Sequence, residues 1–276
     1  MTWPATLSLA YTGQAGQTIA RFRHSGPLRV LQSLYPEGPG ICHNVIVHPP
    51  GGLVGGDSLD LDFSVGTGAH GLVTTPGATR FYRSARLPAV QRSQLVLDAG
   101  SRLEWLPLES IAYSGCIADN RLDLQLAAGS EMIGWDITAL GLPAAGQPFV
   151  EGSFTQRIEL PGIWLEQARI RASDTRLLHS PLGLAGQACF ATLFFACGSA
   201  LVRARRQLAL DVARGVIDGH ALAASAGATS AAPQFVIVRV LAPMVEPALG
   251  LLQQIRQAWR RELWALSGTA PRIWAT

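Results

Sequence analysis

Short apolar runs separated by glycine- and proline-rich turns recur from the N-terminus to about residue 241, and this pattern constrains the fold more than any other feature. Runs of this kind predict β-strands, and a spacing of roughly 8–12 residues favours a sandwich, a barrel or a solenoid of strands. In residues 59–63 apolar and acidic side chains alternate, so a strand there would turn its acids to one side. No strict repeat is visible, so the spacing alone does not indicate a regular β-helix. The chain is therefore predicted to be mainly β.

The last third of the chain changes to a helical pattern. In residues 245–265 apolar side chains recur at intervals of three and four, and polar side chains fill the other faces. The apolar positions are Leu249, Leu252, Ile255, Trp259 and Leu263, and the polar ones are Gln253, Arg256, Arg260 and Glu262. A second helix is expected at residues 203–219. Gly268 is expected to cap the longer helix, and residues 223–232 are expected to form a mobile loop of small side chains.

Every basic residue is an arginine, and the absence of lysine excludes two classes of chemistry. A phosphate-binding loop of the GxxxxGK[ST] type and a Schiff-base enzyme both need the lysine amine. The arginines form no basic stripe with aromatic residues, which argues against nucleic-acid binding. Charged residues make up only 15% of the chain and hydrophobic residues 48%. This balance fits a hydrophobic surface that a partner protein covers, and equally a wide core rich in small apolar residues.

The cysteines and the N-terminus predict a cytoplasmic protein. No CxxC spacing occurs, so the cysteines fit reduced thiols better than a disulfide framework. They are Cys42, Cys116, Cys189 and Cys197. The N-terminus lacks the basic start and the long apolar run of a signal peptide. The most apolar window, residues 185–201, is short for a membrane span and contains polar residues, so it is predicted to be a buried strand.

Candidate catalytic and metal sites are weak when they are taken from the residues alone. Cys42 and His43 are adjacent and would face opposite sides of a strand, which disfavours a closed metal site. The glycine-rich run HPPGGLVGGD at residues 48–57 precedes a strand rather than a helix. It therefore predicts a tight turn ending at Asp57 and not a dinucleotide fingerprint. A GxSxG nucleophile elbow is also absent. The chain is predicted not to be an enzyme.

Longer motifs carry a family resemblance. They are HPPGGLVGGD, TTPGATRFYRS, LEWLP, GWDI and the terminal PRIWAT, and they are spread over nearly the whole chain. The first and the last are long and unusual in composition, which makes them specific. On these motifs the chain resembles the urease accessory protein UreD family, whose members are called UreH in some organisms. The resemblance implies a single domain over residues 1–276.

The resemblance implies a non-enzymatic scaffold for urease maturation. Members of this family bind UreF, which recruits the GTPase UreG, and the assembly docks on apo-urease. The resemblance also implies an internal, water-filled route by which Ni²⁺ reaches the nascent urease active site. The implied fold is a β-helix-like stack of short strands with about two helices in the C-terminal third. The implied setting is the cytoplasm, without nucleic acid or membrane.

Candidate residues follow from the resemblance, position by position. The candidates for nickel passage are Asp57, Thr79, Asp136 and Glu166. Further positions in matched motifs are Glu37, His43, His48, Arg80, Tyr82 and Glu104. The tail residues Arg272, Ile273 and Trp274 are expected to dock on a partner. Scattered carboxylates hold Ni²⁺ weakly enough to release it, so we expect transient Ni²⁺, no tightly bound cofactor and no tight metal site.

Three other interpretations remain open. Asp57 and Asp136 could simply accept hydrogen bonds from buried amides. A carbohydrate-active β-helix enzyme would use Asp60, Asp62 and Glu104, and a purely structural adaptor would have no metal role.

The chain also departs from what the resemblance implies at Leu108, Ser114, Leu142 and Gln147. At Leu142 and Gln147 both members of a possible Arg–Glu pair are replaced, so neither charge is left without its partner.

Overall fold

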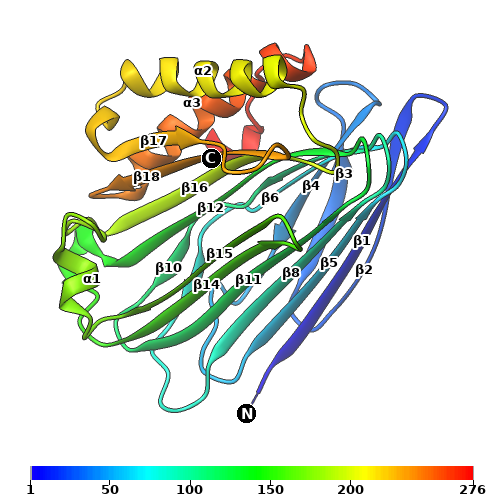
Figure 1. Cartoon of the computed structure of the whole chain (residues 1–276). Coiled ribbons are helices and arrows are strands. Elements are labelled where there is room, and N and C mark those ends of the chain that lie inside the picture. The colour runs from blue at the N-terminus through cyan, green and yellow to red at the C-terminus, as the bar shows by residue number, and fades with distance from the viewer. Residues whose placement is uncertain (1, 276) are drawn as a thin grey trace.

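Two β-sheets face each other, and two long helices cover the outer side of one of them (Figure 1). The computed structural model describes residues 2–275, of which 48% lie in strands and 18% in helices. The strands stack into a β-solenoid of about four turns. The predicted fold class, a mainly β stack of short strands with two helices in the last third, is thereby confirmed.

The first sheet, called sheet A, has seven strands within residues 2–275. Its order is β15 (Trp164–Arg171), β14 (Gly152–Leu160), β11 (Cys116–Leu126), β8 (Ala89–Leu97), β5 (Ser58–Val65), β1 (Pro4–Gln14) and β2 (Gln17–Ser25).

The second sheet, called sheet B, has eleven strands over the same range. Its main path is β17 (Ala226–Thr229), β18 (Phe235–Ala242), β16 (Cys189–Cys197), β12 (Glu131–Leu142), β9 (Arg102–Leu106), β6 (His70–Thr74), β4 (Ile41–Val47) and β3 (Arg29–Leu34). The strands β7 (Thr79–Phe81), β10 (Ser110–Ala112) and β13 (Gln147–Pro148) pair beside this path.

Each coil of the solenoid takes one strand from each sheet. The chain passes from β4 to β5, from β6 to β8, from β9 to β11 and from β12 to β14. Successive coils pair in parallel within both sheets. Residues far apart in the sequence therefore line one continuous interior between the two sheets.

The inward side of each strand supplies the core between the sheets. In β5, Leu59, Leu61 and Phe63 are buried, whereas Asp60 and Asp62 lie on the outer face. The period of two in the sequence therefore predicts correctly which side of this strand faces the core.

A second core lies between sheet B and the helices α2 (Arg203–Asp218) and α3 (Val245–Trp264). Ile255 and Trp259 of α3 are fully buried there, as their spacing predicts. Arg256 and Arg260 are buried as well, although the helical pattern placed them away from the core. Both point toward sheet B because a buried carboxylate pairs with them, as described below.

Three local expectations need correction or completion. Ala265 caps α3 in the left-handed conformation, with φ of 53°, so Gly268 is not the cap. Residues 223–232 are not an unstructured loop, because they contain the 3-10 turn η2 (Ala223–Ser225) and the whole edge strand β17. The remaining short elements are α1 (Thr175–His179) and the 3-10 turns η1 (Pro143–Ala145) and η3 (Arg272–Ala275).

The apolar window at residues 185–201 contains the buried strand β16, Cys189–Cys197, as predicted. The four cysteines are buried, and they are free thiols in the part of the chain that the structure describes. Among residues 2–275 no helix is both long and apolar enough to cross a bilayer.

Candidate functional site

Two adjoining cavities lie between the sheets and contain several of the predicted residues. The larger, of about 230 Å³, is lined by His48, Thr79 and Arg80 together with apolar side chains. The smaller, of about 20 Å³, is lined by Thr79 and reaches Asn120 and Asp136. Their shared lining residues are Thr79, Gln91, Trp105 and Pro107. The two cavities therefore follow one another along the stacking direction of the solenoid.

Asp57 stands beside the outer end of the larger cavity but does not line it. Its Oδ1 accepts a hydrogen bond from the Trp3 amide at 3.2 Å, and its Oδ2 accepts one from the Val54 amide at 3.0 Å. Burial lowers the pKa of His48, and the nearby Asp57 charge opposes that change. The carboxylate of Asp57 thus holds the glycine-rich turn together, and its electrostatic influence extends to His48 on the cavity wall.

Asp136 projects from β12 into the space between the sheets. Its residual exposed surface faces the smaller cavity. It accepts hydrogen bonds from Asn120 Nδ2 at 3.0 Å, Gln156 Nε2 at 2.6 Å and Thr138 Oγ1 at 3.3 Å. Burial raises the pKa of Asp136 to about 6, against the opposing effect of these donors and with a contribution from the Glu166 charge. A carboxylate with this pKa is ready to gain or lose a proton close to neutrality.

Glu166 lies beyond Asp136, at the end of sheet A. Its Oε1 accepts a hydrogen bond from Thr192 Oγ1 at 2.8 Å. Its Oε2 accepts two from Arg239, at 2.7 Å to Nη2 and 3.2 Å to Nε. These three residues line a further cavity of about 380 Å³. Thr192 is also the cross-strand neighbour of Asp136, so Asp136 and Glu166 are separated by one side chain.

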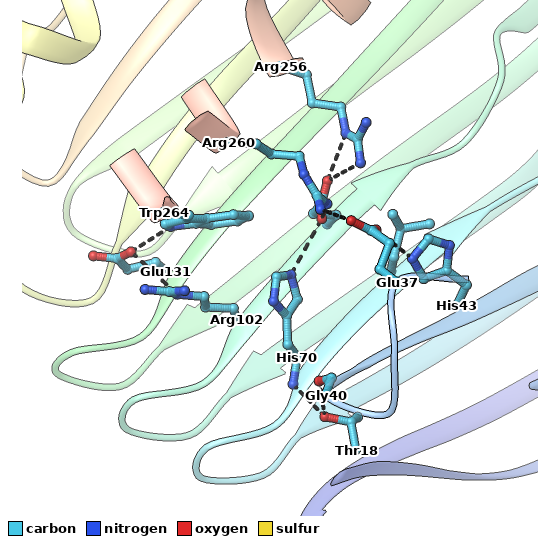
Figure 2. A network of polar contacts seen from close by, with 12 residues as sticks. Thr18, Glu37, Gly40, His43, His70, Arg102, Glu131, Arg256, Arg260 and Trp264 are labelled. Atoms are coloured by element: carbon cyan, nitrogen blue, oxygen red, sulfur yellow. Dashed lines mark hydrogen bonds and ion pairs between the residues drawn. The ribbon is translucent and has the colours of Figure 1, made fainter. Parts of the chain in front are cut away.

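Other predicted residues belong to a separate network under α3, shown in Figure 2. Glu104 on β9 pairs with Arg256 Nη2 at 2.6 Å, and its other oxygen pairs with Arg260. Arg260 also pairs with Glu37, and Oε1 of this ionised carboxylate accepts a hydrogen bond from His43 Nε2 at 3.0 Å. This network faces the helices, on the opposite side of sheet B from the cavities, because neighbouring residues of β9 alternate sides.

Charge compensation dominates this network. Burial by itself would raise the pKa of Glu104, but Arg256, the His70 hydrogen bond and Arg260 outweigh it and lower that pKa to about 2. His70 Nε2 lies 3.4 Å from Glu104, and burial lowers the pKa of this histidine. The two negative charges of Glu37 and Glu104 therefore balance the two positive charges of Arg256 and Arg260, as a buried ionic cluster requires.

Arg80 and Tyr82 have different surroundings, although they are two residues apart. Arg80 lines the larger cavity, whereas the Tyr82 ring packs against Tyr113 with the ring centroids 4.9 Å apart. Asp60, proposed above for a carbohydrate-active site, pairs with Arg92 at 3.1 Å on the outer face of sheet A. Glu104 lies across sheet B, so these carboxylates do not share a site.

The C-terminal segment packs on its own chain. Trp274 donates a hydrogen bond from Nε1 to Thr74 Oγ1 at 2.9 Å, and its ring centroid lies 5.3 Å from that of Trp135. The Arg256 guanidinium lies over the Trp274 ring, 5.6 Å from the ring centroid. Arg272 is exposed, and Ile273 is half-buried. Docking of this tail on a partner stays a prediction, because Trp274 already has an intramolecular role.

The four positions at which the resemblance led us to expect departures have local structural contexts. Ser114 accepts hydrogen bonds from the amides of Val150 and Glu151 at 3.2 and 3.1 Å. Leu142 and Gln147 are direct cross-strand neighbours in the β12–β13 pair, so replacing both together leaves no single charge behind. Leu108 lines the smaller cavity.

We call the cavity at His48, the cavity at Asp136 and the cavity at Glu166, taken in this order, the cavity row. Four residues that line it or bond to its carboxylates were missed by the sequence reasoning: Asn120, Gln156, Thr192 and Arg239. A signal for the first two was present, because each is a polar residue at an inward position of an alternating strand. Asn120 lies between the buried Ala118 and Leu122, for example. Among residues 2–275, no three His, Cys, Asp or Glu side chains converge as a metal site, and the cavity row offers its oxygen donors one or two at a time.

Comparison with known proteins identifies the family. The family model described as UreD urease accessory protein matches residues 4–275. Proteins called urease accessory protein UreD from Polaromonas naphthalenivorans and Polaromonas sp. (strain JS666) are 68% and 67% identical, each over 275 residues. One from Leptothrix cholodnii is 55% identical over 278 residues. In all three cases the match covers 100% of both chains. The chain therefore belongs to the UreD family of urease accessory proteins.

Proposed function

We propose that this urease accessory protein is a scaffold that passes Ni²⁺ to apo-urease along the cavity row between its sheets. In this proposal it acts without catalysis, in the cytoplasm, in an assembly with UreF and with UreG bound through UreF. The ion is cargo, held transiently. The observation that carries the proposal is the order of the candidates: His48 beside Asp57, then Thr79, then Asp136, then Glu166.

The donor chemistry supports a transient site. Ni²⁺ binds imidazole, carboxylate and water, and each stage of the row offers only a few such ligands. Asp136 and Glu166 are each already hydrogen-bonded to protein groups, so a cation has to compete for their oxygens. Binding that must displace existing donors is weak, and weak binding permits release at the far end.

The smaller cavity sets a physical limit on passage. A volume of about 20 Å³ holds roughly one water molecule. A fully hydrated cation does not fit there, so the ion has to exchange water for protein oxygens or the walls have to move. Asp136, at this narrowest stage, offers a carboxylate at the place where hydration is lost.

The test is replacement of the acids in the full chain with its partners co-expressed. We expect Asp136→Ala and Asp57→Ala to lower the nickel content of urease several-fold, because each removes a charge that attracts the cation along the row. Asp62→Ala is the matched control, since Asp62 is exposed on the outer face of β5.

The measurements are metal content of purified urease and co-purification of the accessory proteins. Parental nickel content in both acid variants, with intact assembly, would contradict the proposed route.

A structural adaptor without a metal role is the second candidate, and one observation favours it. Asp136 has three donors around its two oxygens, so each oxygen has at least one hydrogen-bond partner, as a buried carboxylate that serves only the fold requires. The same variants separate the candidates. An adaptor predicts that nickel loading follows the amount of assembled complex, whereas a conduit predicts lost loading in an assembled complex.

A further inference from the structure

Arg239 occupies a position that neither the sequence motifs nor the family assignment explains. It is an inward-facing residue of β18, in the same cross-strand row as Thr192 of β16 and Asp136 of β12. The neighbouring inward residues of β18, Phe235 and Ile237, are buried in the core between the sheets. The positively charged guanidinium of Arg239 therefore lies in the same cross-strand row as side chains that offer oxygen ligands to a cation.

The same side chain closes the gap between the ends of the two sheets. β15 is the edge strand of sheet A, and β18 lies next to the edge of sheet B. The ion pair of Glu166 with Arg239, at 2.7 Å, joins these strands across the opening. Trp164 and Phe235, with ring centroids 5.5 Å apart, join the same two strands. The cavity of about 380 Å³ at this end contains both members of the ion pair.

Both oxygens of Glu166 are taken in this arrangement. Thr192 holds Oε1, and Arg239 holds Oε2 through two N–H donors. A cation cannot bind Oε2 while the guanidinium is there, since like charges would meet at one oxygen. The two partners differ in exposure: the Arg239 side chain is 55% exposed and the Glu166 side chain 18%. An ion pair with one solvated partner is weak, so it can open without disrupting the core.

We propose that Arg239 is a latch on the Glu166 end of the cavity row, and that a divalent cation must displace it to bind Glu166. The latch keeps the free chain a poor binder of cations at this end. It is a positioning element of the route and rests on the proposed function for the role of Glu166.

The experiment measures Ni²⁺ binding to the purified full-length chain by calorimetry. In Arg239→Gln we expect binding at least about fivefold tighter than in the parent, because a unit charge a few ångströms from the cation is removed. Arg169→Gln is the matched control. Arg169 lies three residues from Glu166 on the same strand, is exposed and has no ion pair within residues 2–275. The control should bind Ni²⁺ within about twofold of the parent, because this side chain points away from the cavity.

Two further variants make the outcomes distinguishable. In Glu166→Gln the binding should weaken, and in the double variant Glu166→Gln with Arg239→Gln the gain should vanish. Equal affinity changes in Arg239→Gln and Arg169→Gln would overturn the latch and leave the route intact. Parental Ni²⁺ affinity in Glu166→Gln, together with parental nickel content of urease, would instead refute the role of Glu166 in the route. Thermal unfolding of each variant checks that a structural role of Arg239 does not produce the result.

Discussion

Glu104 shows how a single residue can hold two layers of this protein together. It is fully buried on β9 and pairs with Arg256 and Arg260 of α3, 152 and 156 residues later in the chain. A buried carboxylate is tolerated only with its countercharges, and the two arginines also bond to the carbonyls of Thr269 and Ser267. The cluster thereby fixes the rotation of α3 and the path of the segment after it.

Glu104→Gln is expected to destabilise the protein by about 3–5 kcal/mol, because two guanidiniums are left buried without a full countercharge. The measurement is urea unfolding at pH 7. The comparison is Glu159→Gln, which breaks a partly exposed pair with Arg157 and should cost less than about 1 kcal/mol. Equal losses for the two variants would show that burial of the Glu104 cluster carries no special weight.

The raised pKa of Asp136 predicts that the stability of the protein depends on pH. Its pKa in the folded chain is about 6, above the ordinary value of 3.8. Between these values the folded chain keeps a proton that the unfolded chain has lost, so the free energy of unfolding falls as pH rises from about 4 to 6. The contribution is at most about 3 kcal/mol for this one group.

The check is urea unfolding of the parent and of Asp136→Asn across that pH range. Other titrating groups are common to both proteins, so the difference between their free energies of unfolding isolates Asp136. This difference should change with pH between about 4 and 6 and become constant above about pH 7. A difference that stays flat from pH 4 to 7 would mean that Asp136 is ionised throughout.

At the scale of elements, the turns between coils depend on a few glycines. Gly152, at the start of β14, has φ of 99°, and a Cβ there would collide with the Cys116 carbonyl oxygen of β11. The close approach lets two successive coils pair in register from their first residue. Gly162 also has positive φ, at 74°, but faces open space.

Gly152→Ala and Gly162→Ala separate the cost of backbone strain at positive φ from the cost of the steric collision with β11. We expect a cost of about 1–2 kcal/mol for Gly162→Ala, from backbone strain alone. Gly152→Ala should cost at least about 2 kcal/mol more, because overpacking is added to that strain. Guanidinium unfolding midpoints and slopes give both values. Similar costs would indicate that β11 and β14 can separate at this turn without loss.

The helices illustrate how far local pattern can be taken. Spacing of apolar residues predicted the bounds of α3 to within one residue at each end, and the helix expected at residues 203–219, which end at a glycine, is α2. The same pattern placed Arg256 and Arg260 on the wrong side, because arginine is normally solvated and the buried partner lies in a distant strand. The edge strand β17 was missed because its small residues have little intrinsic strand preference and pair only through β18.

At the scale of the whole molecule, Thr79 is where the route can be blocked. It lines both the larger and the smaller cavity. Thr79→Phe should fill the junction and reduce the nickel content of urease to a small fraction of the parental value, while the accessory assembly still forms. Ser64→Phe is the control, since Ser64 is an exposed residue of β5 and its aromatic replacement leaves the interior unchanged. Parental nickel content in an assembled Thr79→Phe complex would remove the cavity row from the mechanism.

The sequence by itself determined that the chain is mainly β, where the helices lie and which sides of strands such as β5 face the core, because these follow from local periodicity and turn chemistry. Local pattern left a sandwich, a barrel and a solenoid open, and the solenoid was expected only from the family resemblance. Its motifs also determined the family. Only the tertiary structure decided which polar groups meet. Parallel stacking of coils brings Asn120, Asp136 and Gln156 together from three strands, and the ends of two sheets bring Glu166 to Arg239. Such meetings depend on register between distant segments, which no local pattern encodes.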